Sequence, residues 1–139
     1  MADLFFIGQK NSEEFALIRG EVKRVVDNAC CGEFKVDDVG ELIRKGKAFG
    51  AYVADGKEVL IACVWELIYY PRLTSVNVMA LGGRRMKEMW AQCGPVLKKV
   101  WRAQGAQVWQ CEASIPMTKL LRKSGIGLKP IYVTSRETL

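Results

Sequence analysis

The sequence predicts a mixed α/β (α+β) fold in which a mostly antiparallel sheet carries helices on both faces. Apolar residues change along the chain between a helical spacing of three to four and continuous strand-like runs. Asp55-Gly56 separates two such runs, which is a strong signal for a β-hairpin. A third run passes through Gly82-Gly83 directly into a helical pattern. At 139 residues and 50% hydrophobic content, residues 1–139 are expected to form a single domain.

The first part of the chain predicts one strand and two helices. Residues 4–7 form a short apolar run that is typical of a strand. Residues 11–14, Asn-Ser-Glu-Glu, have the spacing of a capping box and predict that a helix begins at the asparagine, and residues 30–32 should end it. The same spacing at residues 38–41 predicts the start of a second, short helix, which should stop at Gly46.

The middle of the chain predicts an antiparallel meander. Residues 49–54 and 59–65 are the two strands of the Asp-Gly hairpin, and residues 73–81 form a third strand after the break at Pro71. A long helix is expected over residues 86–104, with a kink at Gly94-Pro95, because an internal proline removes one helical hydrogen bond.

The C-terminal part predicts three more elements. Residues 107–111 form a strand that should lie parallel to strand 73–81, because a helix connects the two in a right-handed crossover. A short helix over residues 116–123 and a last strand over residues 128–134 follow. The expected order is therefore β-α-α-β-β-β-α-β-α-β.

The glycine-arginine turn is the most informative segment for function. Glycine lets the backbone approach a ligand closely, and free amides at a helix N-terminus attract anions such as phosphate or pyrophosphate. Gly82, Gly83, Arg84 and Arg85 are therefore candidate anion-binding residues. The other interpretation is a tight turn with exposed arginines, which is common between a strand and a helix.

Charge also favours an anionic partner. The net charge is +6, from 21 Lys and Arg against 15 Asp and Glu, and the basic residues gather after residue 80. A phosphorylated cofactor, nucleic acid or an acidic protein surface would each suit such a surface. Nucleic acid is the least favoured of the three, because the basic residues come with no recognised binding motif or interleaved aromatics. The residues that could line one basic face are Lys98, Lys99, Arg102, Lys119, Arg122 and Lys123.

Cysteine and histidine usage limits the chemistry. The five cysteines include no Cys-x-x-Cys pair and there is no histidine, so we expect no metal site and no mechanism that uses a catalytic histidine. An odd number of cysteines fits a reduced, cytoplasmic compartment. No signal peptide or membrane-spanning segment is recognisable, so we expect a soluble protein with no membrane span.

The order of elements resembles that of the GNAT superfamily, the acetyl-CoA-dependent N-acetyltransferases, over nearly the whole chain. The local likeness is to small GNAT-like proteins of tailed phages and prophages. In these, a Leu-Gly-Gly-Arg turn follows the fourth strand, a Met and a Trp follow in the helix, and a Gly-plus-apolar pair closes the last helix. The matching positions are Leu81-Gly82-Gly83-Arg84, Met86, Trp90 and Gly125-Ile126.

The resemblance implies a GNAT-like fold and a cofactor site for acetyl-CoA. The strand before the turn would carry a bulge and diverge from its neighbour, so that the pantetheine arm lies against it like an added strand. The backbone of Met79 and Leu81 would contact that arm, Gly82, Gly83, Arg84 and Arg85 would hold the pyrophosphate, and Ser114 would occupy the position of a CoA-contacting asparagine.

The resemblance also implies direct attack of an amine on the thioester. A carboxylate would take the proton of the attacking ammonium group. Glu66, at the end of the central hairpin strand, is the first candidate, and Glu112, after the next strand, is the second. The other interpretation of both residues is a solvated carboxylate at a strand end.

The chain departs from the GNAT pattern at three points. The usual phosphate-loop motif is Gln or Arg, two residues, Gly, any residue, then Gly or Ala, and neither Gly82 nor Gly83 fits it as the first glycine. The tyrosine that often protonates the departing thiolate corresponds to Leu121, which cannot donate a proton. The CoA-contacting asparagine corresponds to Ser114, whose hydroxyl can still form a hydrogen bond.

Two functions follow from the resemblance. The first is an acetyl-CoA-dependent N-acetyltransferase that acts on a primary amine of a small molecule or a protein in the cytoplasm. The second is a non-catalytic GNAT-fold phage protein, either an internal or structural virion component or a host-directed binding protein. Its expected partners are virion proteins or further copies of itself, and its location is the host cytoplasm or the virion.

Overall fold

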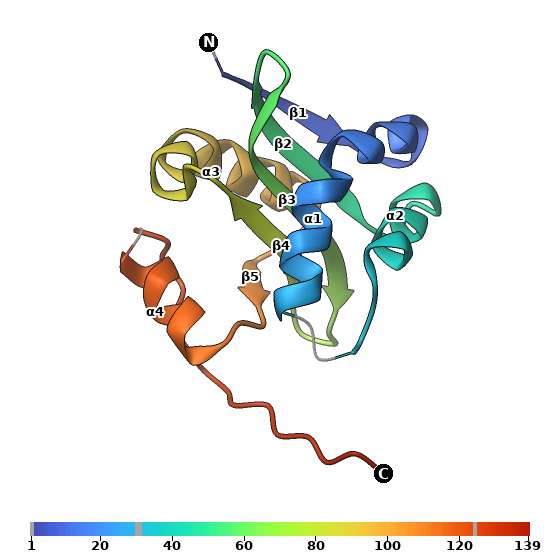
Figure 1. Cartoon of the computed structure of the whole chain (residues 1–139). Helices are drawn as coiled ribbons and strands as arrows, with labels where there is room; N and C mark the ends of the chain where they lie inside the picture. Colours follow the sequence, from blue (N-terminus) through green and yellow to red (C-terminus); the bar gives the residue numbers. More distant parts are fainter. Residues whose placement is uncertain (1, 30–31, 124) are drawn as a thin grey trace.

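The computed structural model describes residues 2–29, 32–123 and 125–139. Within these residues five strands form one sheet in the order β1-β2-β3-β4-β5 (Figure 1). The strands are β1 Asp3–Ile7, β2 Phe49–Asp55, β3 Glu58–Tyr69, β4 Thr74–Gly83 and β5 Val108–Cys111. The helices are the 3₁₀ helix η1 Gln9–Glu14 and the α-helices α1 Phe15–Ala29, α2 Val36–Arg44, α3 Met86–Ala103 and α4 Ile115–Lys123.

The sheet has the predicted topology. Strands β1, β2, β3 and β4 pair with one another in antiparallel order. Gly56 has the positive φ of 61° that the Asp-Gly hairpin requires. Strand β5 pairs parallel to β4, with α3 as the connection between them, as the crossover rule predicts. The prediction of a mixed, mostly antiparallel sheet is therefore confirmed.

Each face of the sheet carries its own hydrophobic core. Figure 1 shows α1 and α2 on one face and α3 on the other. Along β3 the side chains alternate between the two cores: Cys63 and Trp65 pack with α3, whereas Ala62 and Val64 pack with α1 and α2. The burial of both faces explains why this central strand is almost continuously apolar.

An aromatic cluster organises the α3 side. Trp90 and Trp101 of α3 meet Trp109 of β5 with ring centroids 5.5 and 5.3 Å away, and Trp65 of β3 packs 5.8 Å from Trp101. The indole Nε1 of Trp65 donates to Oε1 of Gln104 at 3.0 Å. Trp90 and Trp101 are therefore part of the core on the α3 side, and Trp109 packs against it.

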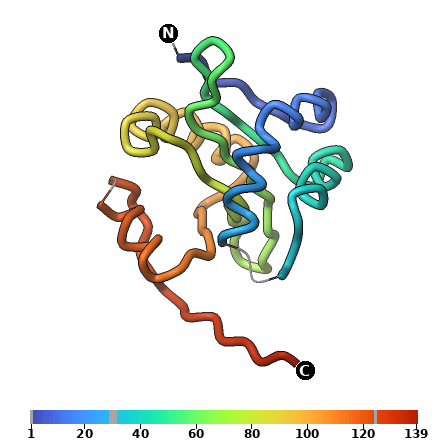
Figure 2. Tube along the Cα trace, viewed as in Figure 1, coloured from blue at the N-terminus to red at the C-terminus, as the bar shows by residue number. Residues whose placement is uncertain are grey.

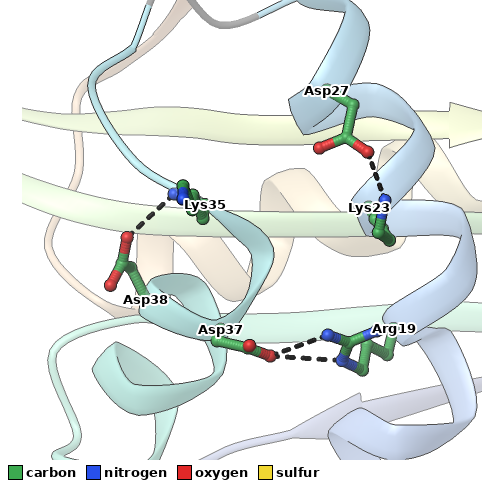
Figure 3. Close-up of polar contacts among 6 residues, drawn as sticks. All are labelled: Arg19, Lys23, Asp27, Lys35, Asp37 and Asp38. Atoms are coloured by element: carbon green, nitrogen blue, oxygen red, sulfur yellow. Dashed lines mark hydrogen bonds and ion pairs between the residues drawn. The ribbon is translucent and has the colours of Figure 1, made fainter.

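Two helical elements, the 3₁₀ helix η1 and the α-helix α2, begin earlier than the sequence predicts, and for the same reason. Asn11 and Asp38 were expected to be N-cap residues, but each lies three residues past the cap. Asn11 Oδ1 accepts the amide of Gly8 at 2.8 Å, and Asp38 Oδ2 accepts the amide of Lys35 at 2.8 Å (Figure 3). These side chains therefore close the helix start from inside the first turn, which is the reciprocal half of a capping box.

An ion pair joins α1 and α2 on the outside of the molecule. Arg19 of α1 donates from Nε and Nη2 to Oδ1 of Asp37 in α2, at 3.2 and 2.9 Å (Figure 3). Both side chains are largely exposed, so this contact adds little to the burial that fixes the helix pair. The predicted end of the first helix at residues 30–32 lies partly outside the described residues.

Helix α3 continues as one element through Pro95, so the kink expected at Gly94-Pro95 stays a prediction; Gly94 packs against the Trp90 ring, which leaves no room for a β-carbon. One prediction for the C-terminal half needs correction. The last strand, residues 128–134, does not form; Figure 2 shows this segment as an extended trace that leaves the body after α4. Strand-like composition alone cannot make a strand without a neighbouring strand to accept its hydrogen bonds, and Pro130 lacks a donor.

Ile18 provides a test of the α1 side of the core. Its side chain is 0% exposed, whereas that of the preceding Leu17 is 60% exposed. We expect Ile18→Ala to lower the free energy of unfolding by about 2–5 kcal/mol, because it removes buried methyl groups and leaves a cavity. The matched Leu17→Ala change is expected to cost less than about 0.5 kcal/mol. Urea denaturation measures both, and equal losses would contradict this packing.

Candidate functional site

Strand β4 carries a bulge in its middle. Val64 of β3 pairs with Ala80 and the next residue, Trp65, pairs with Val78, so Met79 has no partner on β3. An extra residue of this kind bends the strand and increases its local twist. The bulge that the sequence resemblance implies in the strand before the glycine turn is therefore present.

The pairing between β4 and β5 ends at the same place. Ser75 to Val78 pair with Val108 to Cys111, and beyond Val78 no described residue pairs with this edge of β4. The two parallel strands therefore diverge where Met79 bulges. The divergence leaves an open length of β4 edge, residues 79–83, between the bulge and the start of α3.

The backbone amides and carbonyls along this open edge point alternately toward β3 and away from it. The amide of Arg84 donates to the carbonyl of Leu60 on β3 at 3.0 Å. Because hydrogen-bonded residues alternate along an antiparallel pair, Gly82 and Ala80 also bond to β3, whereas Gly83 and Leu81 direct their amides and carbonyls to the open side. The backbone of Leu81 therefore faces the open side of β4, where the resemblance implies an extended ligand.

The two glycines are required by packing. A β-carbon on Gly83 would lie 2.2 Å from the carbonyl oxygen of Leu60 and 2.7 Å from Cα of Ile61. One on Gly82 would lie 2.5 Å from Cγ2 of Val25 in α1. Gly83 therefore allows β3 to approach closely and Gly82 allows α1 to pack, so the Gly-Gly pair is explained without a ligand.

The start of α3 still offers an anion-binding geometry. Arg85 is the N-cap residue, and its carbonyl accepts the amide of Met89 at 2.8 Å. The amides of residues 86–88 have no backbone acceptor in the described part of the chain and emerge at the positive end of an 18-residue helix. This helix end lies directly after the open edge of β4.

Arg84 and Arg85 flank the helix start, and each pairs with a glutamate. Arg84 Nη1 lies 3.1 Å from Oε1 of Glu58, and Arg85 pairs with Glu88 one turn into α3. All four side chains are exposed. Surface pairs of this kind contribute little free energy, so both arginines are able to exchange these carboxylates for a phosphate.

A row of polar side chains crosses the sheet next to the bulge. Glu66 of β3 pairs with Asn77 of β4, which pairs with Gln110 of β5. Asn77 Nδ2 donates to Oε1 of Glu66 at 3.0 Å. Ser75, which is 0% exposed, donates from Oγ to Oε1 of Gln110 at 2.9 Å. The neighbouring residues Trp65, Val76, Val78 and Trp109 all pack toward α3, so the polar row lies on the α1 side.

The sequence predicts Glu66 as a candidate base but does not single out its neighbours. Asn77, Ser75 and Gln110 each interrupt an apolar strand, which is the signal that could have singled them out. Their assembly into one row depends on the pairing of three strands, which a single sequence does not reveal. The structure thus turns an isolated carboxylate into a half-buried, hydrogen-bonded one.

The remaining candidates lie further along the chain. Glu112 is exposed and follows directly after Cys111, which pairs with Val78 beside the bulge. Ser114 is the first residue before α4, and its Oγ accepts the amide of Met117 at 3.2 Å, so it acts here as a helix cap. Leu121, at the position of the family's tyrosine, is buried in the same core cluster as Ile126.

The thiols near the site are poor nucleophiles. Burial raises the pKa of the Cys93 thiol to about 11, and it also raises the pKa values of Cys63 and Cys111. Cys111, at the end of β5, is the one beside the bulge. Because the thiolate is the reactive form, this residue does not favour a covalent acyl-enzyme route at neutral pH.

No group of three or more metal-ligating side chains gathers in residues 2–29, 32–123 and 125–139. In the same residues no helix combines the length and the apolar composition that a membrane crossing needs.

Comparison with solved structures identifies the fold. The chain superposes on an aminoglycoside acetyltransferase from an uncultured soil metagenomic sample, crystallised with sisomicin, with a TM-score of 0.67, 9% identity and coverage of 99% and 96% of the two chains. A ribosomal-protein-alanine N-acetyltransferase from Brucella melitensis biovar Abortus 2308 matches with a TM-score of 0.70, 12% identity and complete coverage of both chains. A Trypanosoma brucei acetyltransferase matches with a TM-score of 0.66 and 7% identity, again over both whole chains.

No protein-family model and no curated protein sequence matches the chain. The structural matches therefore show the fold, which is that of the GNAT acetyltransferases. The predicted GNAT-like fold is confirmed.

Gly83 provides a test of the packing explanation. We expect Gly83→Ala to lower the free energy of unfolding by about 1–3 kcal/mol, because the new methyl group presses on the backbone of β3. Gly20, inside α1, has open space around its Cα, and Gly20→Ala should raise stability by about 0.5–1 kcal/mol. Urea denaturation measures both changes, and a neutral Gly83→Ala protein would show that the close approach of β3 is not required.

Proposed function

We propose that the protein is an acetyl-CoA-dependent N-acetyltransferase that acetylates a primary amine of a small molecule or a protein. One observation carries the proposal: the bulge at Met79 coincides with the end of β4–β5 pairing, directly before the exposed amides of α3. An open strand edge that leads to a helix N-terminus suits a ligand with an amide-containing arm and a pyrophosphate.

In this proposal the open edge of β4 binds the cofactor. The backbone of Leu81, together with that of Met79, hydrogen-bonds the pantetheine amides. The amides at the start of α3 and the side chains of Arg84 and Arg85 hold the pyrophosphate, with Gly82 and Gly83 keeping this part of the backbone close to β3 and α1. Ser114 lies at the entrance to α4, where its hydroxyl could exchange its helix-capping bond for a contact with CoA.

The reaction follows from the groups that meet at the bulge. Bound acetyl-CoA supplies an activated acetyl group as a thioester. Glu66 removes a proton from the acceptor ammonium, and the amine nitrogen then forms a bond to the acetyl carbon. A backbone amide at the bulge stabilises the negative charge that develops on the carbonyl oxygen. As the carbon–sulfur bond breaks, the nitrogen loses its second proton to solvent, and the leaving thiolate would take a proton from solvent because Leu121 has none to give.

The polar row explains why Glu66 is favoured over Glu112. Asn77 fixes the Glu66 carboxylate through a 3.0 Å hydrogen bond, and both lie next to the bulge. A fixed carboxylate keeps its second oxygen in one direction, which a general base needs. Glu112 is exposed and follows the end of β5, so it is the alternative base. The similar enzymes act on aminoglycosides and ribosomal-protein alanine, which supports an amine acceptor here.

A second function is supported by the C-terminal surface. Large apolar side chains are exposed on α4 and the tail, among them Ile115, Leu120, Ile131, Tyr132 and Val133. Such a surface suits protein–protein contacts. It supports the non-catalytic alternative, in which a GNAT-fold protein serves as a phage virion component or a host-directed binding protein.

Binding of acetyl-CoA tests the cofactor site first. Isothermal titration calorimetry should give a micromolar Kd, and the double change Arg84→Ala with Arg85→Ala should raise it at least about tenfold, because two charge-assisted contacts to phosphate are lost. Arg102, an exposed residue near the other end of α3, is the matched control, and Arg102→Ala should leave Kd within about twofold. An absence of binding at millimolar acetyl-CoA would overturn the acetyltransferase proposal.

The role of Glu66 is tested by an isosteric change. Glu66→Gln keeps an oxygen for the Asn77 hydrogen bond but cannot accept the proton, so kcat should fall at least about a hundredfold while the Kd for acetyl-CoA stays unchanged. The assay follows thiol release from acetyl-CoA with a panel of primary amines. Glu112→Gln is the matched comparison and should retain most of the activity. The opposite order of effects would assign the base to Glu112.

A further inference from the structure

Strand β5 is an open edge of the sheet. It has four residues, Val-Trp-Gln-Cys, and pairs with β4 on one side only within the described chain. It contains no proline, lysine or other charged residue, which are the residues that usually protect an edge strand from pairing with another chain. Its side chains also remain partly uncovered: Val108 is exposed and Trp109 is half-buried.

Residues 128–134 form an unpaired strand-like segment. Three consecutive large residues with high strand preference, Ile131, Tyr132 and Val133, are 75%, 87% and 88% exposed. In Figures 1 and 2 the segment runs as an extended trace away from the sheet. Within the described residues its backbone hydrogen bond lies at its start, where the amide of Leu128 donates to the carbonyl of Ile126 at 2.9 Å.

Both ends of this segment are attached to the body of the same chain. Ile126, just before it, is 2% exposed in the core on the α3 side. Arg136, just after it, forms an ion pair with Glu33 of the α1–α2 connection, with a distance of 2.9 Å between Nη2 and Oε1. Between these two attachments the segment is extended and apolar, and its backbone amides and carbonyls have no partner strand among the described residues.

We propose that residues 128–134 of one copy of the chain pair with the β5 edge of a second copy, and that the second copy does the same in return. Each copy has an open β5 edge and an unpaired strand-like segment, so reciprocal exchange covers both. The exchange produces a closed dimer with twofold symmetry, because the same two surfaces are used on both copies. The addition of a strand to an open edge gives affinity through backbone hydrogen bonds and specificity through the side chains beside them.

Pro130 fixes the direction in which the segment pairs. A proline has no amide proton, so it can lie in an edge strand only where that position turns away from the neighbouring strand. Because these directions alternate along a strand, Tyr132 and Thr134 turn their amides outward as Pro130 does, whereas Ile131 and Val133 turn their amides toward β5. The side chains of the added segment then lie alternately on the two faces of the sheet. Val108 lies on one of these faces and Trp109 on the other, and both offer apolar contact.

Two neighbouring proline substitutions test the proposal. Val133→Pro removes an amide that bonds to β5, whereas Thr134→Pro removes one that points to solvent. Both lie in the extended tail, outside the helices and strands of the sheet, so folding should be unaffected. A dimer contains the exchanged strand twice and loses two hydrogen bonds with Val133→Pro, so the dimer Kd should rise at least about tenfold. Thr134→Pro should change it less than about threefold.

The measurement is sedimentation equilibrium of the full chain and both variants over a range of concentrations, with amide hydrogen exchange of the wild type and Val133→Pro proteins. The proposal expects a wild-type dimer and slower exchange in Val108–Cys111 of the dimer, with no change in Asp3–Ile7 at the other sheet edge. A wild-type monomer at all concentrations would overturn it. So would a dimer with equal sensitivity to both prolines, or one that protects Asp3–Ile7 instead of Val108–Cys111.

Discussion

The termination of β4–β5 pairing at Val78 is the constraint on which the candidate site depends. Strand β4 stays paired with β3 as far as Gly83, so it has to bend away from β5 while it remains part of the sheet. The extra residue at Met79 supplies that bend. It brings an open backbone edge, the start of α3 and a hydrogen-bonded carboxylate to one place, and each of these would lose its function if β5 continued alongside β4.

The glycine turn illustrates how one sequence signal can have another cause. Gly82-Gly83 before two arginines predicts an anion site, but the structure accounts for the glycines through Leu60, Ile61 and Val25. The amide of Arg84 is also bonded to Leu60. The anion-binding capacity therefore belongs to the first turn of α3, beyond the glycines. Their contribution is indirect: they let β4 run against β3 up to the point where that helix begins.

Most of the fold could be predicted because its signals are local. The Asp-Gly hairpin, the helical periodicity of α1 and α3, and the crossover to β5 all depend on short stretches of sequence. The errors occur where a partner decides the outcome. Asn11 and Asp38 act from inside the first turn, since the backbone amides they accept are three residues earlier. Residues 128–134 have the composition of a strand, but among the described residues no strand lies beside them. Likewise, Glu66 could be identified from its place in a strand, whereas Asn77 and Gln110 join it only through cross-strand register.

The loss of recognisable motifs is compatible with retained chemistry because the backbone carries most of the proposed site. Amides at a bulge and at a helix N-terminus are independent of side-chain identity, so a site of this kind needs few sequence motifs, and the chain shares its fold with structures that are only 7–12% identical. A thiolate is a fair leaving group, so in the proposed reaction Leu121 in place of a tyrosine removes an aid to catalysis without preventing the transfer. The side chains that chemistry does require are few, and Glu66 with Asn77 meets the most demanding requirement, a carboxylate held in one orientation beside the bulge. A scaffold that used this fold only for binding would need none of that arrangement, and the hydrogen-bonded row next to Met79 is therefore the feature that favours an enzyme.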